Sequence, residues 1–580
     1  MPRDAHTIGS MSLIAFREER IPRGHHDERC AATRIASVMI FASLFAVAVF
    51  LFSHPTVADA AMLQSTQGQK PAAAGPEVSG QEKQSLDRAM TALQRNDLKE
   101  AEREARAAVA SAPRSSVAHN VLGVVLDRSG RRDHAYAEFN EALKIDPSYL
   151  SARNNLGRLL AESGKVNEAI AQFEIVLKAD PSHVQAHFNL GEIYAEAGEY
   201  SKSADHLAAA RVSNPEDPQL ALAFVKVGYR ANRNAEADAA ADAFERVVNN
   251  DAQALFTLAT ILAQNKQYER AARLFAIVNK AAPRTYEVLY NLGLSLYNLD
   301  KNEEAGQYLA EAADMNPAPP ETHFRLGLIA SARSDTANAV EEFKHAVERD
   351  PKNARYHHLL GREYFRAGFW DGAIEEFSKA IDIDPKNTIY LLARADANYR
   401  KGEWIASAAD FDHAAAMDPK IENIEYWQAH AHRAAGDFDL ARQYLEKFVS
   451  AHPDNAEALA SLGYVAIEQG RLEDAEAPLK KALAVDSKNV PAMYDYARLA
   501  LKRRDYSEAV LRLQRVIENN PANTQAFYQL FLAYSRLKQA DKAQSALAEF
   551  KRLDALEKQS TQERIIDEKL RTRQMLGQPQ

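Results

Sequence analysis

The chain has 580 residues, of which 71 are Lys or Arg and 80 are Asp or Glu, so its formal net charge at pH 7 is −9. This acidic balance excludes a general nucleic-acid-binding surface, which needs a clearly basic domain. The apolar fraction of 46% and the charged fraction of 26% are those of a globular protein. A single cysteine, Cys30, excludes an internal disulfide framework, a cysteine-rich zinc site and a CxxC redox pair.

Residues 1–60 are expected to direct export. Residues 35–52 form an uncharged apolar run of 18 residues that follows Arg29 and Arg34, and Ala58-Asp59-Ala60 has the small-residue spacing that a signal peptidase needs. The run is long for a signal peptide and short for a spanning helix, which needs about 20 residues. A cleaved signal peptide and a retained anchor in the inner membrane therefore both stay open. In either case the flanking arginines predict that the rest of the chain is exported, and a bacterial periplasm is the expected location.

From residue 82 to residue 557 the sequence repeats every 34 residues, which makes fourteen units. Position 8 of the unit is Gly or Ala in twelve units, position 20 is Ala in twelve, and position 32 is Pro in eleven. Within residues 286–319 two stretches have apolar residues at helical spacing, and Pro317 ends the second. Each unit therefore predicts two helices, which small residues at positions 8 and 20 allow to approach closely. One pair cannot bury its apolar face alone, so the pairs must stack.

Two further features of the repeat identify a family. Five units end in Asp-Pro, and Leu-Gly occupies positions 7 and 8 in seven units: Leu122-Gly123, Leu156-Gly157, Leu190-Gly191, Leu292-Gly293, Leu326-Gly327, Leu360-Gly361 and Leu462-Gly463. Together with the period, this pattern resembles the tetratricopeptide repeat (TPR) family. The resemblance implies an all-α, right-handed superhelical solenoid of about fourteen helix-turn-helix units. It says little about function, because the repeat is a binding scaffold used for many partners.

The segments that flank the repeats, and one irregular unit, complete the domain organisation. Residues 61–81 are rich in Ala, Pro, Gly and Gln, and we expect a disordered linker there. Residues 558–580 are charged with loosely spaced Ile and Leu, which predicts a C-terminal capping helix and a tail. The fifth unit, residues 218–251, has Val225 at position 8 and Asn249 at position 32, so its packing departs most from the pattern.

The sequence contains no motif for catalysis, and we predict that the protein is not an enzyme. HExxH, GxSxG, GxxxxGK[ST] and GxGxxG are all missing from the sequence. Outside the repeats there is only a targeting segment, a linker and a 23-residue tail, which leaves no room for a catalytic domain. Four histidines share position 4, where the family places a bulky packing residue, so we interpret them as packing residues: His119, His187, His323 and His357. We therefore expect neither a cofactor nor a metal.

Function is then expected on the surface of the first helices, where positions 2, 5, 9 and 12 lie opposite the core stripe. In this family that side lines a concave groove. The candidate partner-binding residues fall into three groups. Aromatic residues at position 5 are Phe188, Phe256, Tyr290, Phe324, Tyr426, Tyr494 and Tyr528. Basic residues at positions 2, 9, 12 and 13 of the last six units are Arg355, Arg362, Arg366, Arg400, Arg433, Arg498, Lys502 and Arg536. Asparagines at position 6, which resemble a ladder seen in some members of the family, are Asn155, Asn189 and Asn291.

These residues predict an exported scaffold or adaptor that holds a partner protein or an acidic peptide in its groove. The competing interpretation of the same residues is that the aromatic rings pack against the adjacent helix pair and the arginines are solvated. Two further functions stay open, a membrane-anchored assembly factor of the cell envelope and the non-catalytic arm of a glycosyl- or sulfo-transfer system. We also predict that replacing Arg362, Arg366 and Arg433 spares the fold, because all three lie away from the core stripe.

Overall fold

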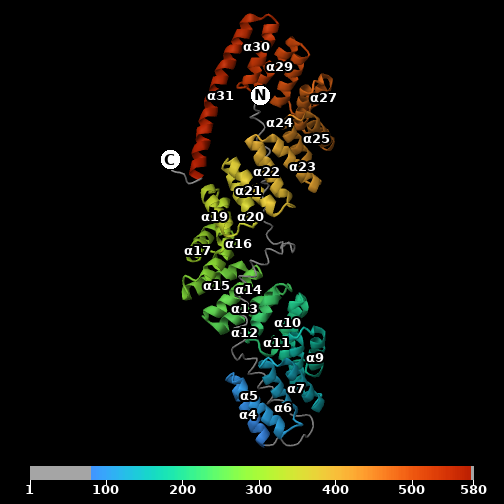
Figure 1. Cartoon of the computed structure of the whole chain (residues 1–580), viewed down its shortest axis with the longest axis vertical. Helices are drawn as coiled ribbons and strands as arrows, with labels where there is room; N and C mark the ends of the chain where they lie inside the picture. Colours follow the sequence, from blue (N-terminus) through green and yellow to red (C-terminus); the bar gives the residue numbers. More distant parts are fainter. Residues whose placement is uncertain (1–79, 576–580) are drawn as a thin grey trace. The chain divides into compact units, whose positions relative to one another are not determined.

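The computed structural model describes residues 80–575, and all regular secondary structure in this range is α-helical. Its 28 helices, α4 to α31, form fourteen pairs in which an even-numbered first helix is followed by an odd-numbered second helix (Figure 1). The expected all-α protein of repeated helix pairs is confirmed, and the handedness of the superhelix stays a prediction. The expected signal or anchor segment, all but the end of the expected linker, and residues 576–580 lie outside the described residues.

The described chain falls into two compact units, which we call the N-terminal unit, residues 80–305, and the C-terminal unit, residues 306–575. The division lies within α17 (Asn302–Met315). The other helices of the N-terminal unit are α4 (Gly80–Gln94), α5 (Leu98–Ser111), α6 (Ser116–Arg128), α7 (Arg132–Ile145), α8 (Leu150–Glu162), α9 (Val166–Ala179), α10 (Val184–Glu196), α11 (Tyr200–Ser213), α12 (Pro218–Gly228), α13 (Asn234–Val248), α14 (Ala252–Gln264), α15 (Tyr268–Ala281) and α16 (Tyr286–Asn298).

The C-terminal unit continues the same alternation to the end of the described chain. Its helices after α17 are α18 (Pro320–Ala332), α19 (Thr336–Arg349), α20 (Ala354–Arg366), α21 (Trp370–Ile383), α22 (Thr388–Lys401), α23 (Trp404–Met417), α24 (Ile424–Ala435), α25 (Phe438–Ala451), α26 (Ala456–Glu468), α27 (Leu472–Val485), α28 (Val490–Lys502), α29 (Tyr506–Asn519), α30 (Thr524–Arg536) and α31 (Ala540–Met575).

Local signals explain where the helices begin and end. Many first helices start after a Ser, Asp or Asn whose side chain accepts a hydrogen bond from a backbone N–H of the first turn, as Ser115 does from Ala118 at 3.1 Å and Asn523 from Ala526 at 2.8 Å. The turn inside each pair has a left-handed residue at position 15 in all fourteen units, Gly in seven and a non-glycine such as Asn96 or Lys538 in the others. This residue reverses the chain into the second helix.

The core of a pair depends on close contact between positions 8 and 24. In Gly123, Gly157 and Gly361 an added Cβ would lie only 2.6–2.8 Å from the ring of the residue sixteen positions later, Phe139, Phe173 or Phe377. These rings are fully buried. Position 20 is fully buried from Ala101 to Ala509. Small residues at positions 8 and 20 therefore bring the two helices of a pair together, as the sequence predicts.

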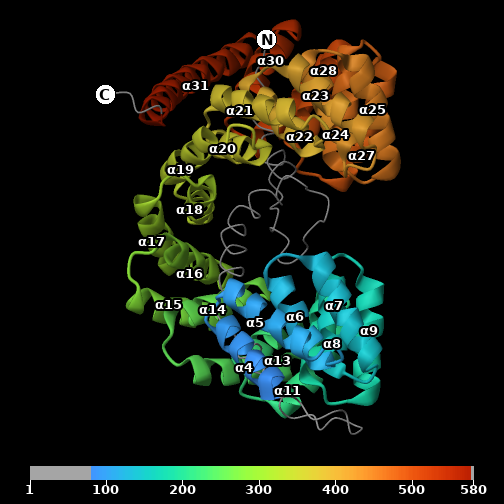
Figure 2. The same cartoon turned by 60° about the horizontal axis from the view of Figure 1, so that its bottom comes forward.

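Consecutive pairs stack through contacts between each second helix and the next first helix. In the N-terminal unit α7 contacts α8 and α9 contacts α10, and Figure 2 shows α6 to α9 side by side. In the C-terminal unit the series runs from α19 against α20 to α29 against α30. Each pair thus contacts mainly its neighbours in sequence, which is the arrangement of a solenoid.

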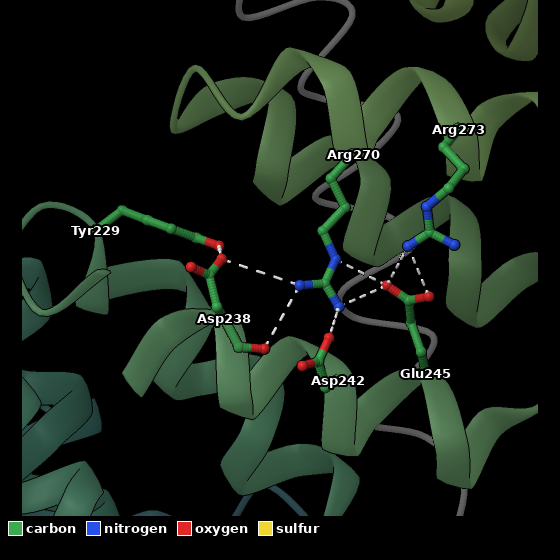
Figure 3. A network of polar contacts seen from close by, with 6 residues as sticks. All are labelled: Tyr229, Asp238, Asp242, Glu245, Arg270 and Arg273. Atoms are coloured by element: carbon green, nitrogen blue, oxygen red, sulfur yellow. Dashed lines mark hydrogen bonds and ion pairs between the residues drawn. The ribbon is translucent and has the colours of Figure 1, made fainter. Parts of the chain in front are cut away.

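The fifth pair, α12 and α13, has an additional polar network that joins it to the sixth (Figure 3). Arg270 of α15 donates to Asp242 at 2.6 Å and to Glu245 at 2.8 Å, both on α13. Arg270 also donates to the backbone oxygen of Asp238 at 3.4 Å, and Tyr229 donates to the Asp238 carboxylate at 2.5 Å. In this pair Val225 replaces the usual glycine or alanine at position 8 and is fully buried. The network holds the irregular pair against its successor.

The last second helix, α31, is much longer than the others. It spans 36 residues, from Ala540 to Met575, and Figure 1 shows it continuing past α30 as one straight rod. The charged segment after residue 557 is therefore a continuation of this helix.

Candidate partner-binding surface on the first helices

Residues at repeat positions 2, 5, 6, 9, 12 and 13 of the first helices form a surface that we call the first-helix band. Its members contact each other from one first helix to the next. In the N-terminal unit Glu192 lies 3.5 Å from Lys226, one repeat later. In the C-terminal unit Arg366 Nη1 donates to Ser331 Oγ at 2.9 Å, and Arg433 lies over the ring of Tyr464. Members of the band therefore contact each other between these neighbouring first helices, and the candidate residues belong to the band.

The structure favours internal packing for several of the aromatic residues at position 5. Tyr290, Phe324 and Tyr426 are buried, with 6%, 2% and 7% of their surface exposed. The ring of Phe324 lies 5.0 Å from that of Tyr356, and the ring of Tyr426 lies 5.1 Å from that of Phe448. These three rings fill the space between helices and offer little surface to a partner.

The other four position-5 rings are more accessible but also have internal contacts. Phe256 packs edge-on against Phe275 at 5.6 Å, and Tyr528 lies 5.2 Å from Phe550 while 38% of its surface stays exposed. Phe188 and Tyr494 are half-buried. Tyr528 is thus the most accessible of the seven aromatic candidates.

Two of the three asparagines form a ladder between neighbouring first helices. Asn155 Nδ2 donates to Asn120 Oδ1 at 3.0 Å, and Asn189 Nδ2 donates to Asn154 Oδ1 at 3.2 Å. Asn291 instead donates to the backbone oxygen of Glu287, within its own helix, at 2.7 Å. The amide groups of Asn155 and Asn189 therefore link α6, α8 and α10, as the resemblance to a ladder suggests for these two residues.

Half of the basic candidates are paired with carboxylates of the chain itself. Arg366 donates to Glu363, which is completely buried and also accepts from Ser331 Oγ at 2.7 Å. Arg362 Nε lies 3.7 Å from the same carboxylate, and Arg498 pairs with Glu468 and, at 2.8 Å, with Asp495. Arg400 lies 3.5 Å from Asp396.

These pairs change two sequence-based expectations. The paired arginines are held by carboxylates of the chain, although the side chain of Arg366 remains 41% exposed. The expectation that replacing Arg362 and Arg366 spares the fold is withdrawn, because Arg366 hydrogen-bonds and Arg362 approaches a completely buried carboxylate, Glu363. A buried charge that loses its partner is strongly destabilising.

Arg355 and Arg433 are different, since neither has a carboxylate partner among the residues that the structure describes. The guanidinium of Arg355 lies 5.1 Å from the ring centre of Phe324, and that of Arg433 lies 5.3 Å from the ring centre of Tyr464. Arg498 approaches the Tyr464 ring at 5.3 Å as well. Stacking on a ring holds a guanidinium in place and leaves its charge uncompensated. Lys502 and Arg536 are exposed and also have no carboxylate partner among the side chains that the structure describes.

Two buried histidines and one buried aspartate, which the candidate list omits, line the same band. Burial, and then the charges of Arg362 and Arg355, lower the pKa of His358 to about 3. Burial, and then the charge of Arg433, hold the pKa of His430 well below its ordinary value. Both rings are therefore neutral near pH 7. Burial raises the pKa of Asp396 to about 7, an effect that Arg400 partly offsets. His430 and Asp396 occupy position 9 of their units, as do the candidates Arg362 and Arg498. This shared position is the signal that could have identified His430 and Asp396.

The position-4 histidines have a recurring structural role. His119, His323 and His357 each bond through Nδ1 to the glutamate nineteen residues later, at 2.6–2.8 Å. In His119 and His357, Nε2 bonds to the backbone oxygen of the proline that ends the preceding unit. His187 has the same proline contact but pairs with His206. No group of three or more metal-ligating side chains converges within residues 80–575.

Comparison with known proteins confirms the family. Models of the tetratricopeptide repeat match residues 86–149, 154–218, 256–320, 290–354, 361–402, 426–491 and 466–521. These ranges cover more than half of the chain, so the protein belongs to the TPR family. They leave residues 219–255 between them, which is nearly all of the irregular fifth unit. No curated protein sequence matches the chain.

Solved structures that match this chain include two that are described as TPR proteins. The C-terminal part of a TPR protein from Cytophaga hutchinsonii is 21% identical, with 41% of this chain and 98% of that chain covered and a TM-score of 0.35. YrrB, described as a TPR protein with an unusual peptide-binding site, is 25% identical, with 33% and 98% covered and a TM-score of 0.28. A chain of the Naa15/Naa10 complex bound to HypK is 15% identical, with 86% and 100% covered and a TM-score of 0.32.

A TPR protein of this kind is a protein-interaction scaffold, and the TPR fold is typically non-catalytic. None of the helices between residues 80 and 575 has the length and apolar character that crossing a membrane requires.

Proposed function

We propose that this chain is an exported, non-catalytic scaffold that binds acidic groups of a partner protein or peptide along the first-helix band of the C-terminal unit. The observation that carries the proposal is the surroundings of the Arg355 and Arg433 guanidinium groups. Each guanidinium is stacked on an aromatic ring and lacks a carboxylate partner among the described residues. Arginines placed in this way are suited to bind a carboxylate with two parallel hydrogen bonds.

The neutral surroundings of these arginines support an acidic partner. Arg433 stands beside His430, and Arg355 beside His358, and both histidines are neutral near pH 7. The nearby carboxylates Glu363 and Glu468 are occupied by Arg366 and Arg498. The net charge of Arg355 and Arg433 is therefore available to a partner, although the whole chain is acidic. Such charges mainly raise the association rate and select the partner.

Export is supported by the sequence alone. The apolar run 35–52, the arginines before it and the small residues at 58–61 fit a signal peptide or a signal anchor of a periplasmic protein. N-terminal sequencing of the mature protein decides between the two. A new N-terminus near Ala61 means cleavage, and an intact N-terminus means a scaffold anchored in the inner membrane.

The binding proposal is tested with a short glutamate-rich peptide, acetylated and amidated, and the same peptide with glutamine at every glutamate. Arg433→Gln and Arg355→Gln should each weaken binding of the glutamate peptide about tenfold, which corresponds to about 1.4 kcal/mol. A charge-assisted hydrogen bond contributes about 1.5–3 kcal/mol, so this loss is close to the lower end of that range.

The matched control is Arg442→Gln on α25, since Arg442 pairs with Glu446 in its own helix and lies outside the first-helix band. Arg442→Gln should leave binding of the glutamate peptide unchanged. The melting temperatures of all three variants should equal that of the wild type. Equal binding of the glutamate and glutamine peptides, or full binding by both band variants, would show that the band does not recognise acidic groups.

A further inference from the structure

The histidine at position 4 joins the two helices of a pair in the second, eighth and ninth units. Its Nδ1 bonds to the glutamate at position 23, on the second helix. In His119 and His357 the other nitrogen faces a backbone oxygen, so both nitrogens point at acceptors. A doubly protonated ring donates from both nitrogens and fits this arrangement. Burial alone would lower the pKa of His357, but its bond to Glu376 raises it overall.

The fourth pair, α10 and α11, has a histidine in place of this glutamate. His187 Nδ1 lies 3.0 Å from His206 Nδ1, and His187 Nε2 lies 3.0 Å from the backbone oxygen of Pro181. A carbonyl oxygen only accepts hydrogen bonds, so Nε2 of His187 carries a proton. Nδ1 of the neutral His187 ring is then unprotonated and accepts from the Nδ1–H of His206. The contact between the two helices thus depends on a single proton between two imidazole rings.

This contact limits how many protons the two histidines hold together. One extra proton fits on Nε2 of His206, because the Nδ1–H of that ring still donates to His187. A second extra proton would go to Nδ1 of His187 and would bring two N–H groups and two positive rings into contact. Burial, and then the charge of His187, lower the pKa of His206, which agrees with this limit. The closed contact therefore holds one proton fewer than two separated histidines hold in acid.

The charged groups around the two rings do not replace this contact. The ring of His206 stacks on that of Tyr194, with ring centres 5.6 Å apart. The charges of Asp205 and Glu174 partly offset the lowering of the His206 pKa, but among the described residues neither His187 nor His206 bonds to a carboxylate. Other polar groups on α10, α11 and the helices packed against them have partners of their own: Lys202 with Glu199, Asp205 with Arg233, Lys226 with Glu192, Arg153 with Gln172, and Arg158 with Asp127 and Glu162.

We propose that the contact between His187 and His206 is an acid-sensitive clip. In mild acid both rings become protonated, the contact opens and the fourth helix pair loosens, while the second, eighth and ninth pairs keep their histidine–glutamate bonds. The inference concerns the solenoid itself and does not depend on the proposed function.

The sign of the pH dependence follows from the proton count. Separated histidines have a pKa of about 6.5. The closed clip binds fewer protons than the open one, so its stability is present above about pH 6.5 and is lost as the pH falls below that value. The equilibrium constant for opening should rise about tenfold for each pH unit below 6.5, which is about thirtyfold between about pH 7.5 and about pH 5.

Hydrogen exchange of the whole chain measures this opening. Rates are divided by those of an unstructured peptide at the same pH, which removes the pH dependence of the chemistry itself. In the wild type, the protection of residues 184–213 should fall about thirtyfold from about pH 7.5 to about pH 5. In His206→Glu it should stay high, because this change restores the bond of the sibling units. Residues 116–145, which carry the clip of His119 and Glu138, are the control within each molecule.

Two further variants test whether the histidine pair itself is the sensor. Glu138→His places a second histidine opposite His119 and should make residues 116–145 as acid-sensitive as residues 184–213. His183 caps α10 by accepting from the N–H of Ala186 at 3.2 Å, so its protonation would also weaken this helix. His183→Asn keeps a capping side chain that does not titrate, and this variant should retain the acid sensitivity of the wild type.

The outcomes separate the clip from other effects of acid. The proposal is overturned if residues 184–213 of the wild type keep their protection at about pH 5, or if His206→Glu loses protection as the wild type does. It is also overturned if His183→Asn abolishes the acid sensitivity, since the cap would then be the sensor. Unchanged protection of residues 116–145 in a folded Glu138→His variant would equally show that a facing histidine pair does not open in acid.

Discussion

A glycine at position 8 of the repeat determines how closely the two helices of a pair approach. A Cβ on Gly361 would lie 2.7 Å from the ring of Phe377 and 3.2 Å from the backbone oxygen of Ala373. The ring is fully buried, so it cannot move aside without disturbing its neighbours. Helix propensity favours alanine over glycine, but here the steric cost dominates.

We therefore expect Gly361→Ala to lower the free energy of unfolding by about 1–3 kcal/mol, the usual cost of overpacking a core. The matched control is Gly306→Ala in α17, where the nearest atom to an added Cβ is 3.8 Å away. That variant should be stabilised by about 0.5–1 kcal/mol. Denaturant titration of both variants measures the difference. Similar effects for the two would mean that the helix pair tolerates a wider separation.

At the residue scale, the sequence predicts the packing positions far better than the binding positions. Position 8 is recognisable because only a very small residue fits against the ring at position 24, and this constraint recurs in unit after unit. Tyr426 at position 5 carries no such signal, because an aromatic ring there can face either the core or a partner. The pairing of Arg366 with Glu363 and Ser331 depends on the register between two helix pairs, which a single repeat does not encode.

At the scale of the helix, the fifth pair shows how an irregular unit is kept in the stack. Its first helix, α12, has 11 residues, and family models leave most of this unit unmatched. The three acidic residues of α13 that face α15 are bound by Arg270, which contacts Asp238, Asp242 and Glu245 (Figure 3). Burial tends to lower the pKa of Arg270, but its bonds to Glu245 and Asp242 raise it overall, so the arginine is firmly charged.

Arg270→Ala should therefore lower the stability of the fifth and sixth pairs by about 1–2 kcal/mol. This loss is smaller than the loss of fully buried charged hydrogen bonds would be, because Asp242 is largely exposed to solvent. Hydrogen exchange should become faster across residues 218–281 and stay unchanged in α4 to α9. Arg273→Ala is the control, since Arg273 is more exposed and contacts only Glu245; its effect should be about 0.5 kcal/mol or less. Equal effects of the two variants would contradict a special role for Arg270.

The irregular fifth unit can be located from the sequence, but the arginine network that holds it in the stack cannot. Val225 and Asn249 break the repeat pattern and are visible as exceptions. Arg270, by contrast, is an ordinary charged residue on a second helix, and its three acidic partners lie 25–32 positions away. Only the stacking of α13 against α15 brings them together.

At the scale of the whole molecule, stability is expected to be divided between the two compact units. Each helix pair contacts mainly its neighbours, so unfolding of one unit does not require unfolding of the other. The three tryptophans, Trp370, Trp404 and Trp427, all lie in the C-terminal unit. Tryptophan fluorescence therefore reports on the C-terminal unit alone, while circular dichroism at helical wavelengths reports on both units.

We expect the unfolding curves from these two probes to differ in midpoint, because a two-state transition would make them coincide. The residue substitutions above provide the internal test. Gly361→Ala, in the C-terminal unit, should shift both the fluorescence curve and part of the circular dichroism curve to lower denaturant. Arg270→Ala, in the N-terminal unit, should shift only the circular dichroism curve and leave the fluorescence midpoint in place. If the two probes give one coincident transition, and if Arg270→Ala moves the fluorescence midpoint as far as Gly361→Ala does, the described chain unfolds as a single cooperative body.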